Sequence, residues 1–95
     1  MPEMRFGIRW PDGTAESCYS PSLVIKDYFA PGESYALADF VERSRSALNI
    51  ASERVAAKYG WRCSRATAQL ERIETAARVF ANLPEPRVIV ETFDE

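Results

Sequence analysis

The chain has no histidine, only two cysteines and no long hydrophobic run. Histidine is the commonest general base near neutral pH and the commonest metal ligand, so its absence argues against most hydrolase and zinc-site chemistries. Two cysteines are too few for a disulfide scaffold. The longest apolar runs, such as the one in RVIVETF at 87–93, are far shorter than the ~20 residues that cross a bilayer. We therefore expect no metal, no cofactor and no membrane partner.

A strong excess of charge of one sign is missing as well. The formal net charge is −2, and Arg and Lys are interleaved with Asp and Glu along the chain. Such a mixture gives no field strong enough to attract nucleic acid. The first ten residues, MPEMRFGIRW, lack the apolar stretch of a signal peptide. We expect a cytoplasmic protein with reduced thiols and no nucleic-acid partner.

The chain has 46% hydrophobic and 27% charged residues, which is the composition of an ordinary globular protein. A chain of 95 residues supports one hydrophobic core, so residues 1–95 are expected to form a single domain. The local patterns described next predict an α+β fold in the order ββαααβ. In this fold a three-stranded sheet is covered by helices on one face only.

A β-hairpin is the clearest local signal. Residues 4–10, MRFGIRW, alternate apolar side chains with Arg5, Gly7 and Arg9, which is the period of a half-buried strand. The sequence WPDGT that follows is typical of a three-residue turn in which Gly13 takes a left-handed conformation. The strand after this turn therefore runs antiparallel to the first.

The turn also fixes which residues face each other across the hairpin. With residues 11–13 in the loop, Phe6 lies opposite Cys18 and Arg5 lies opposite Tyr19. Cys18 then points to the core side of the sheet, and Tyr19 points to the outer side with the arginines. A slip of one residue would exchange the two side chains.

Helix signals fill the middle of the chain. Ser20 and Pro21 are typical of a helix start and predict a short helix from Pro21 to Phe29. After the break APGES at 30–34, in which Ser34 or a neighbour is expected to act as a cap, apolar spacing predicts one long helix from Leu37 to Tyr59.

Local residue patterns also predict where the long helix ends and which elements follow it. Gly60 is typical of a residue that ends a helix, with Trp61 folding back over the last turn. A third amphipathic helix is expected after Ser64, ending before LPEP at 83–86. The β-branched segment 87–93 predicts a final strand that is buried on both faces or paired beside a partner.

Four stretches together carry a resemblance to a known family: MRFGIRWPDG, CYSPS, LADFVERSRSALNIASERVAAKYG and the following Cys63. They resemble the small nitrogen-starvation response family first named from mycobacteria, over residues 4–64. The resemblance implies a gene cluster that also encodes a nitrilase, a radical-SAM protein, an acetyltransferase-like protein and a flavoprotein, linked to nitrogen limitation and cyanide assimilation. It implies a pathway and carries no catalytic residue over to this chain.

Cys63 is the sharpest chemical candidate. It lies between Arg62 and Arg65 and next to a helix start, where positive charge and the helix dipole favour a thiolate. This arrangement suits a small thiol-dependent enzyme or a redox sensor. The alternative is a structural role, in which Cys63 packs as a small apolar residue against Ala68 and Ser64 caps the helix.

Cys18 is interpreted as a core residue, because a free cysteine opposite Phe6 is usually a buried hydrophobic side chain. A pairing of Cys18 with Cys63 would make a redox switch or half of a metal site. Two thiolates without histidine leave the remaining metal ligands unspecified.

Arg5, Arg9 and Tyr19 form a candidate binding patch on the outer face of the hairpin, where Gly7 permits close approach of another backbone. Such a patch suits an anion, a metabolite or a partner protein; an ordinary solvated sheet face is the alternative. If Val24, Ile89 or Phe93 joins Tyr19 on this uncovered face, dimerisation explains the patch.

The function expected from the sequence is that of a non-catalytic accessory or regulatory protein in a nitrogen-starvation pathway. It is expected to act by protein–protein interaction, to form a homo-oligomer, in the first place a dimer, and to contact enzymes of the same gene cluster. The alternatives are thiol chemistry at Cys63 and the binding of an anion or metabolite at Arg5 and Arg9.

Overall fold

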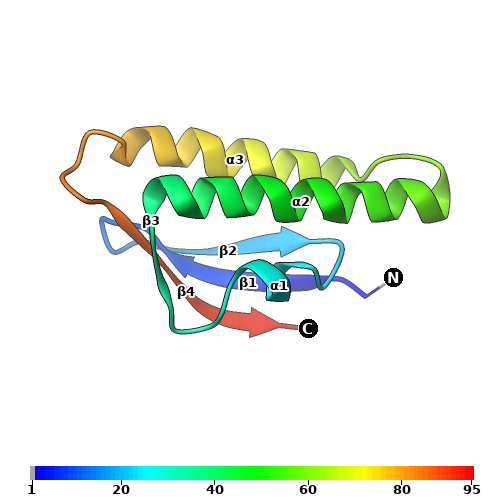
Figure 1. Ribbon diagram of the computed structural model, residues 1–95, viewed down its shortest axis with the longest axis horizontal. Coiled ribbons are helices and arrows are strands. Elements are labelled where there is room, and N and C mark those ends of the chain that lie inside the picture. Colours follow the sequence, from blue (N-terminus) through cyan, green and yellow to red (C-terminus); the bar gives the residue numbers. More distant parts are fainter. Residues whose placement is uncertain (1) are drawn as a thin grey trace.

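The computed structural model describes residues 2–95, which form a layer of helices on a layer of strands (Figure 1). The elements in chain order are β1 (Met4–Arg9), β2 (Ala15–Ser20), α1 (Ile25–Tyr28), β3 (Ser34–Ala36), α2 (Leu37–Tyr59), α3 (Ser64–Phe80) and β4 (Arg87–Asp94). The strands are antiparallel in the order β2-β1-β4-β3. The predicted α+β class is confirmed.

Figure 1 shows α2 and α3 side by side over one face of the sheet. No helix formed by residues 2–95 covers the opposite face in this view. The predicted one-sided arrangement is therefore present. Within the same residues, no helix is long and apolar enough to cross a membrane.

The predicted three-stranded sheet is wrong, because the segment before α2 adds a fourth strand. Ser34, Tyr35 and Ala36 pair with the first residues of β4, so the order of elements is ββαβααβ. Ser34 does not cap α2: its hydroxyl accepts a hydrogen bond from Arg87 Nε at 2.7 Å. The N-cap position is held by Ala36, which makes no side-chain cap bond.

The predicted hairpin is confirmed in its turn and its register. The Trp10 N–H donates to the Thr14 carbonyl at 2.8 Å, and Gly13 has a φ of +89°, which a side chain would disfavour. Phe6 lies opposite Cys18 and Arg5 opposite Tyr19. Cys18 is therefore on the core side of β2.

The first helix is much shorter than the predicted span Pro21 to Phe29. Only Ile25–Tyr28 is helical, and Phe29 is already extended. The Ser20 hydroxyl, expected to cap this helix, instead donates to the Ser22 carbonyl at 2.7 Å and forms a local turn. A serine that satisfies its own neighbours in a turn competes with helix formation.

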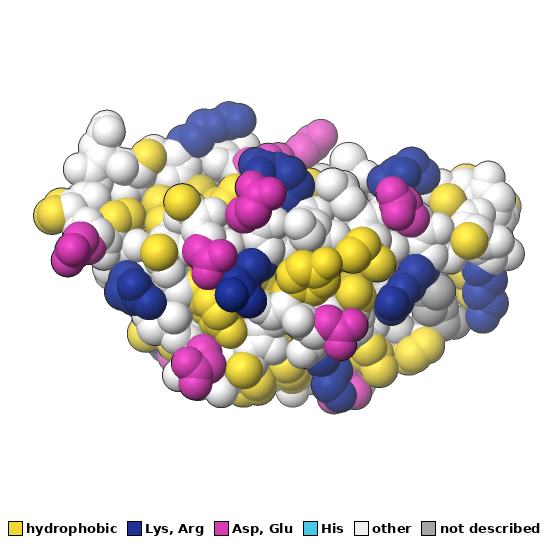
Figure 2. Space-filling view, in the orientation of Figure 1, with side chains coloured by type: hydrophobic (Ala, Val, Ile, Leu, Met, Phe, Trp, Pro, Cys, Tyr) yellow, Lys and Arg dark blue, Asp and Glu magenta, His cyan; other side chains and the backbone are white. Residues whose placement is uncertain are grey.

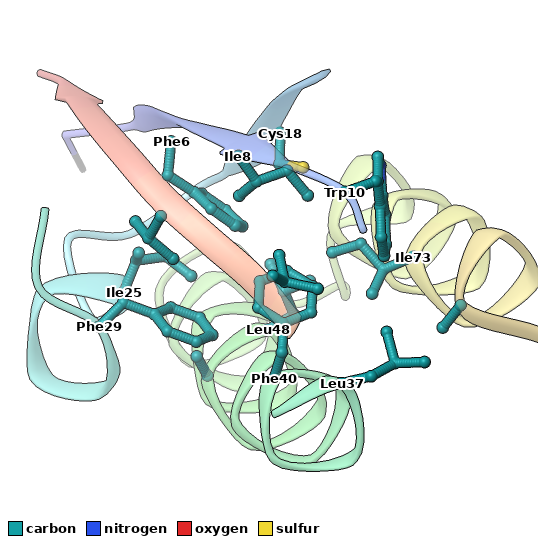
Figure 3. Packing of buried hydrophobic residues seen from close by; sticks show 14 of the residues in the cluster. Phe6, Ile8, Trp10, Cys18, Ile25, Phe29, Leu37, Phe40, Leu48 and Ile73 are labelled. Atoms are coloured by element: carbon teal, nitrogen blue, oxygen red, sulfur yellow. The ribbon is translucent and has the colours of Figure 1, made fainter. Parts of the chain in front are cut away.

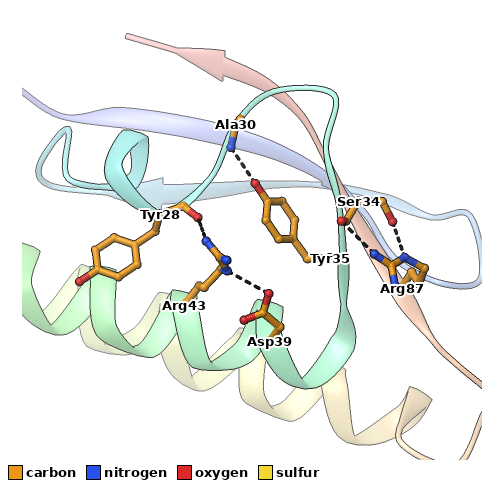
Figure 4. A network of polar contacts seen from close by, with 7 residues as sticks. All are labelled: Tyr28, Ala30, Ser34, Tyr35, Asp39, Arg43 and Arg87. Carbon is orange, nitrogen blue, oxygen red and sulfur yellow. Dashed lines mark hydrogen bonds and ion pairs between the residues drawn. The ribbon is translucent and has the colours of Figure 1, made fainter.

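Arg43 of α2 contacts the connection between α1 and β3 and so holds this connection against the helix layer (Figure 4). Its guanidinium donates to the Tyr28 carbonyl at 2.7 Å and to Asp39 at 3.0 Å. The same group lies 5.1 Å from the centre of the Tyr35 ring. The Tyr35 hydroxyl in turn accepts from the Ala30 N–H at 2.8 Å. Side-chain contacts thus add to the backbone hydrogen bonds that Gly32 and Glu33 form with Val90 in holding the connection between α1 and β3.

The two long helices have the predicted extent, with one difference at the start of α3. Gly60 follows α2 with a φ of +86°, the left-handed conformation expected at this position. Cys63 is the N-cap residue of α3 and Ser64 is the first helical residue, so the predicted cap at Ser64 is wrong. Ala68 is exposed and provides no buried surface for the predicted staple with Cys63.

The final strand is confirmed, but the prediction that it is buried on both faces is wrong. β4 lies between β1 and β3 in the sheet. Val88 and Val90 are fully buried against the helices, whereas Ile89 on the other face is 39% exposed. The strand is apolar because it occupies the interior of the sheet, and its outer side is open.

The core lies between the sheet and the two long helices (Figure 3). Phe6 and Ile8 of β1 and Trp10 directly after it point inward. They meet Phe40 of α2 and Ile73 of α3. Cys18 is fully buried in the same cluster, so the prediction that it packs in the core is confirmed.

Candidate functional site

Tyr19 is the centre of a cluster of charged and aromatic side chains on the outer side of β2. The Arg65 guanidinium lies 3.8 Å from the centre of the Tyr19 ring, and the Arg5 guanidinium lies 5.9 Å from it. Both distances suit cation–π contact. Arg65 also pairs with Glu3 at 3.7 Å. Burial, followed by the Glu3 carboxylate, raises the pKa of Tyr19 to about 12.

A pocket of about 320 Å³ opens beside this cluster, between the start of β1, the end of β2 and the turn that joins α2 to α3. We call it the Tyr19 pocket; its lining residues are Glu3, Tyr19, Pro21, Val55, Tyr59, Trp61 and Cys63. Gly60 reverses the chain after α2 and places the Trp61 ring 6.2 Å from the Tyr59 ring. Trp61 is nevertheless 69% exposed, so its predicted folding back leaves most of the ring in solvent.

The structure brings together some of the predicted site residues and separates others. Tyr19 and Cys63, which the sequence suggests for two different roles, both line the Tyr19 pocket, and Arg5 lies beside the Tyr19 ring. Arg9 is engaged elsewhere: its guanidinium pairs with Glu91 at 3.0 Å and donates to the Gly13 carbonyl at 2.6 Å.

The outer sheet face has less apolar surface than the dimer hypothesis supposes. Val24 is 3% exposed and belongs to the core, and Phe93 packs partly against the core. Ile89 is the member of that trio that faces outward, opposite Arg9. A Cβ at Gly7 would collide with the Thr92 hydroxyl of β4, so this glycine makes room for the neighbouring strand.

The two thiols occupy contrasting environments, and both are free. Cys18 is fully buried, and burial, followed by the Glu16 carboxylate, raises the pKa of its thiol to about 12. Cys63 is partly exposed and lines the Tyr19 pocket. Chemistry that needs an accessible sulfur is therefore confined to Cys63.

Iodoacetamide at pH 8 should label one cysteine of the folded protein, Cys63, because Cys18 is neither accessible nor ionised there. Intact-mass measurement over time followed by peptide mapping checks this result. In denaturant both cysteines should react. Labelling of Cys18 at a rate close to that of Cys63 would contradict the buried position of Cys18.

The turn beside the pocket is basic, although the whole chain has a net negative charge. The exposed cations are Arg54 and Lys58 at the end of α2, Arg62 in the turn and Arg65 at the start of α3, and Glu53 is the acidic residue of the same stretch. Arg65 alone among these cations forms an ion pair within residues 2–95. The open side of the pocket therefore combines exposed aromatic rings with positive charge.

No group of three or more His, Cys, Asp or Glu side chains within residues 2–95 is arranged to hold a metal ion. The lining of the Tyr19 pocket offers aromatic rings, one carboxylate and one thiol, and the guanidinium groups of Arg65 and Arg5 lie beside it against Tyr19. Such a set is suited to binding an apolar group next to a negative charge.

Comparison with known proteins gives one family. The family model described as nitrogen starvation-induced protein NitG matches residues 5–93. A search of curated proteins and a search of solved structures gave no match. The matched range covers both long helices and the lining of the Tyr19 pocket except Glu3.

Proposed function

Because the chain belongs to the family of nitrogen starvation-induced protein NitG, we propose that it is an accessory protein of the nitrogen-starvation response that binds a partner protein through the Tyr19 pocket. The exposure of Trp61 carries this proposal. Trp61 is 69% exposed and Tyr59 is 44% exposed, side by side at the rim of a concave site. Trp and Tyr in or beside such pockets are typical of the few residues that dominate binding energy at protein interfaces.

The charge of this surface favours an acidic partner. Arg54 and Lys58 at the end of α2 and Arg62 in the turn have no ion-pair partner among residues 2–95. An apolar side chain of the partner would fill the 320 Å³ pocket against Pro21 and Val55. Acidic residues flanking that side chain would lie near the cations, which speeds association and selects the partner. The proposed ligand is therefore an acidic segment with one apolar anchor.

This surface supports a partner contact better than the bare sheet face does. Among residues 2–95 the sheet face carries one large exposed apolar side chain, Ile89, among charged groups such as Arg9 and Glu91. Lasting dimer interfaces are more apolar than that. Self-association through the sheet remains a prediction from the sequence.

Replacing Trp61 with alanine should weaken binding of the partner by roughly thirtyfold, which corresponds to about 2 kcal/mol for a residue that dominates an interface. The test is co-purification of the tagged protein from nitrogen-starved cells of its host, followed by titration of the captured protein. Val79→Ala is the matched control, because Val79 is 75% exposed near the far end of α3.

Fluorescence separates binding at the pocket from binding elsewhere. Trp10 is buried, so a change in tryptophan emission on binding would report Trp61. We expect a blue shift that is lost in Trp61→Phe, and binding that weakens as salt is raised. Equal capture by the wild-type protein and Trp61→Ala, or binding that is insensitive to salt, would reject the proposal.

Thiol chemistry at Cys63 is a second candidate, favoured by the place of this sulfur in the pocket wall. The two functions make opposite predictions for Cys63→Ser. A binding surface keeps most of its affinity when sulfur is replaced by oxygen, whereas a thiol-dependent enzyme or redox sensor loses its activity. Growth of the host under nitrogen limitation with the Cys63→Ser protein distinguishes them.

A further inference from the structure

A second and larger hollow lies at the opposite end of the helix layer from the Tyr19 pocket. It is a groove of about 890 Å³ between the first turns of α2, the last turns of α3 and the loop that leads into β4. In Figure 2 hydrophobic side chains are exposed among charged ones at the left end, where Figure 1 places this loop. The volume is within the range of about 300 to 1,000 Å³ that is usual for sites of small molecules.

The groove has an apolar floor. Leu37 and Ala77 are each 7% exposed at its base, and Val41 and Ala81 add apolar surface beside them. Because two of these side chains are alanines, the facing helices leave space that larger residues would fill. An apolar group placed on this floor would remove hydrocarbon surface from water.

Three arginines and two glutamates lie in the lining of the groove. Arg45 is neutralised by two carboxylates, Glu42 at 2.8 Å and Glu74 at 2.8 Å. Arg87 donates to the hydroxyl and the carbonyl of Ser34, which are neutral groups.

The guanidinium of Arg78, also in the lining, has no hydrogen-bond or ion-pair partner among residues 2–95. Glu85 is the lining carboxylate outside the Arg45 pairs. Arg78 and Arg87 are therefore the lining guanidinium groups without a carboxylate partner among residues 2–95, and the apolar floor lies beside them.

We propose that this groove binds a small organic anion with an apolar body. The apolar body would lie on Leu37, Val41 and Ala77, and the carboxylate would accept hydrogen bonds from Arg78 and Arg87. Guanidinium groups suit carboxylates because they offer paired N–H donors together with a permanent charge. This site is separate from the Tyr19 pocket, and the proposal does not depend on a partner protein.

Octanoate is a suitable probe, since it joins a carboxylate to an apolar chain. In ¹H–¹⁵N spectra of the full chain, octanoate should cause saturable shifts of the amides of Ala38, Val41, Ala77 and Ala81. Octanol and octylamine, which have the same chain without the negative charge, should bind much more weakly. Acetate, which has the charge without the chain, should cause no saturable shift.

Arg78→Gln should weaken octanoate binding by about tenfold, because it removes a charge-assisted hydrogen bond. Arg78 makes no contact that the fold needs, so this variant should fold normally. Arg72→Gln is the matched control: Arg72 is an exposed arginine of α3 that bonds Glu16 outside the groove. Shifts that do not saturate, shifts that map to the Tyr19 pocket, or equal binding of octanol would overturn the proposal.

Discussion

Replacing Phe40 with alanine should lower the free energy of unfolding by about 3 to 5 kcal/mol. Phe40 is fully buried on α2, where its ring lies 5.7 Å from that of Trp10 in an edge-to-face contact and 5.3 Å from that of Phe29. The ring therefore joins α2 to β1 and to the connection after α1. Removing the ring takes away the apolar surface that it buries. It also leaves a cavity between α2, β1 and the connection after α1.

The size of this effect matters because a domain of this kind is stable by only about 5 to 15 kcal/mol. Urea unfolding followed by circular dichroism at neutral pH measures the change. Val79→Ala, in an exposed position of α3, should change the stability by less than about 0.5 kcal/mol. A loss of under about 1 kcal/mol for Phe40→Ala would mean that the core is not organised around this ring.

The parts of the fold that the sequence predicted well are those with strong local signals. The hairpin depends on the turn residues 11–13 and on the alternation that follows, so its register could be worked out pair by pair. The long helix has many residues at three- and four-residue spacing and a glycine at its end. In both the hairpin and the long helix, the residues that determine the structure lie within or directly beside it in the sequence.

The errors occurred where distant residues decide the structure. β3 has three residues, which is too short for an alternating pattern, and it forms because residues 34–36 pair with the start of β4. α1 is shortened because Ser20 and Ser22 bond to each other, and Arg43 holds the connection to α2. The Arg43 contact joins residues 15 apart and has no signature in the local sequence. The Ser20–Ser22 contact is local, but a serine before a proline suits a helix cap as well as a turn.

The candidate site was predicted in pieces and not as a whole. Tyr19 and Cys63 were each singled out, but their meeting depends on how α3 packs beside β2, where the Tyr19 N–H donates to the Gln69 side chain at 2.9 Å. The local pattern predicts that Trp61 covers the end of α2. Its exposure depends on the absence of a neighbouring element over the turn within residues 2–95, which a local pattern does not reveal.

Raising the pH from 8 to about 10.5 should destabilise the protein through Cys18. The thiol has a pKa of about 12 in the fold, against an ordinary value of 9.0, because it is buried among apolar side chains. The folded-state pKa is the higher one, so the contribution to stability is complete below pH 9 and is lost as the pH rises toward 12. Above pH 9 the unfolded chain releases a proton that the folded protein keeps, and the free energy of unfolding falls by about 1.4 kcal/mol per pH unit.

Cys18→Ala isolates this effect from other groups that titrate in alkali, such as Tyr19, whose pKa is also raised by burial. Urea unfolding at pH 8 and at about pH 10.5 should show a loss for the wild-type protein that exceeds the loss for Cys18→Ala by about 2 kcal/mol. Cys63→Ala should keep the wild-type dependence, because Cys63 is partly exposed at the pocket. If Cys18→Ala and the wild-type protein lose stability equally, Cys18 ionises in the folded protein as readily as in the unfolded chain. The sulfur would then be reached by water, and the core would be open beside Phe6.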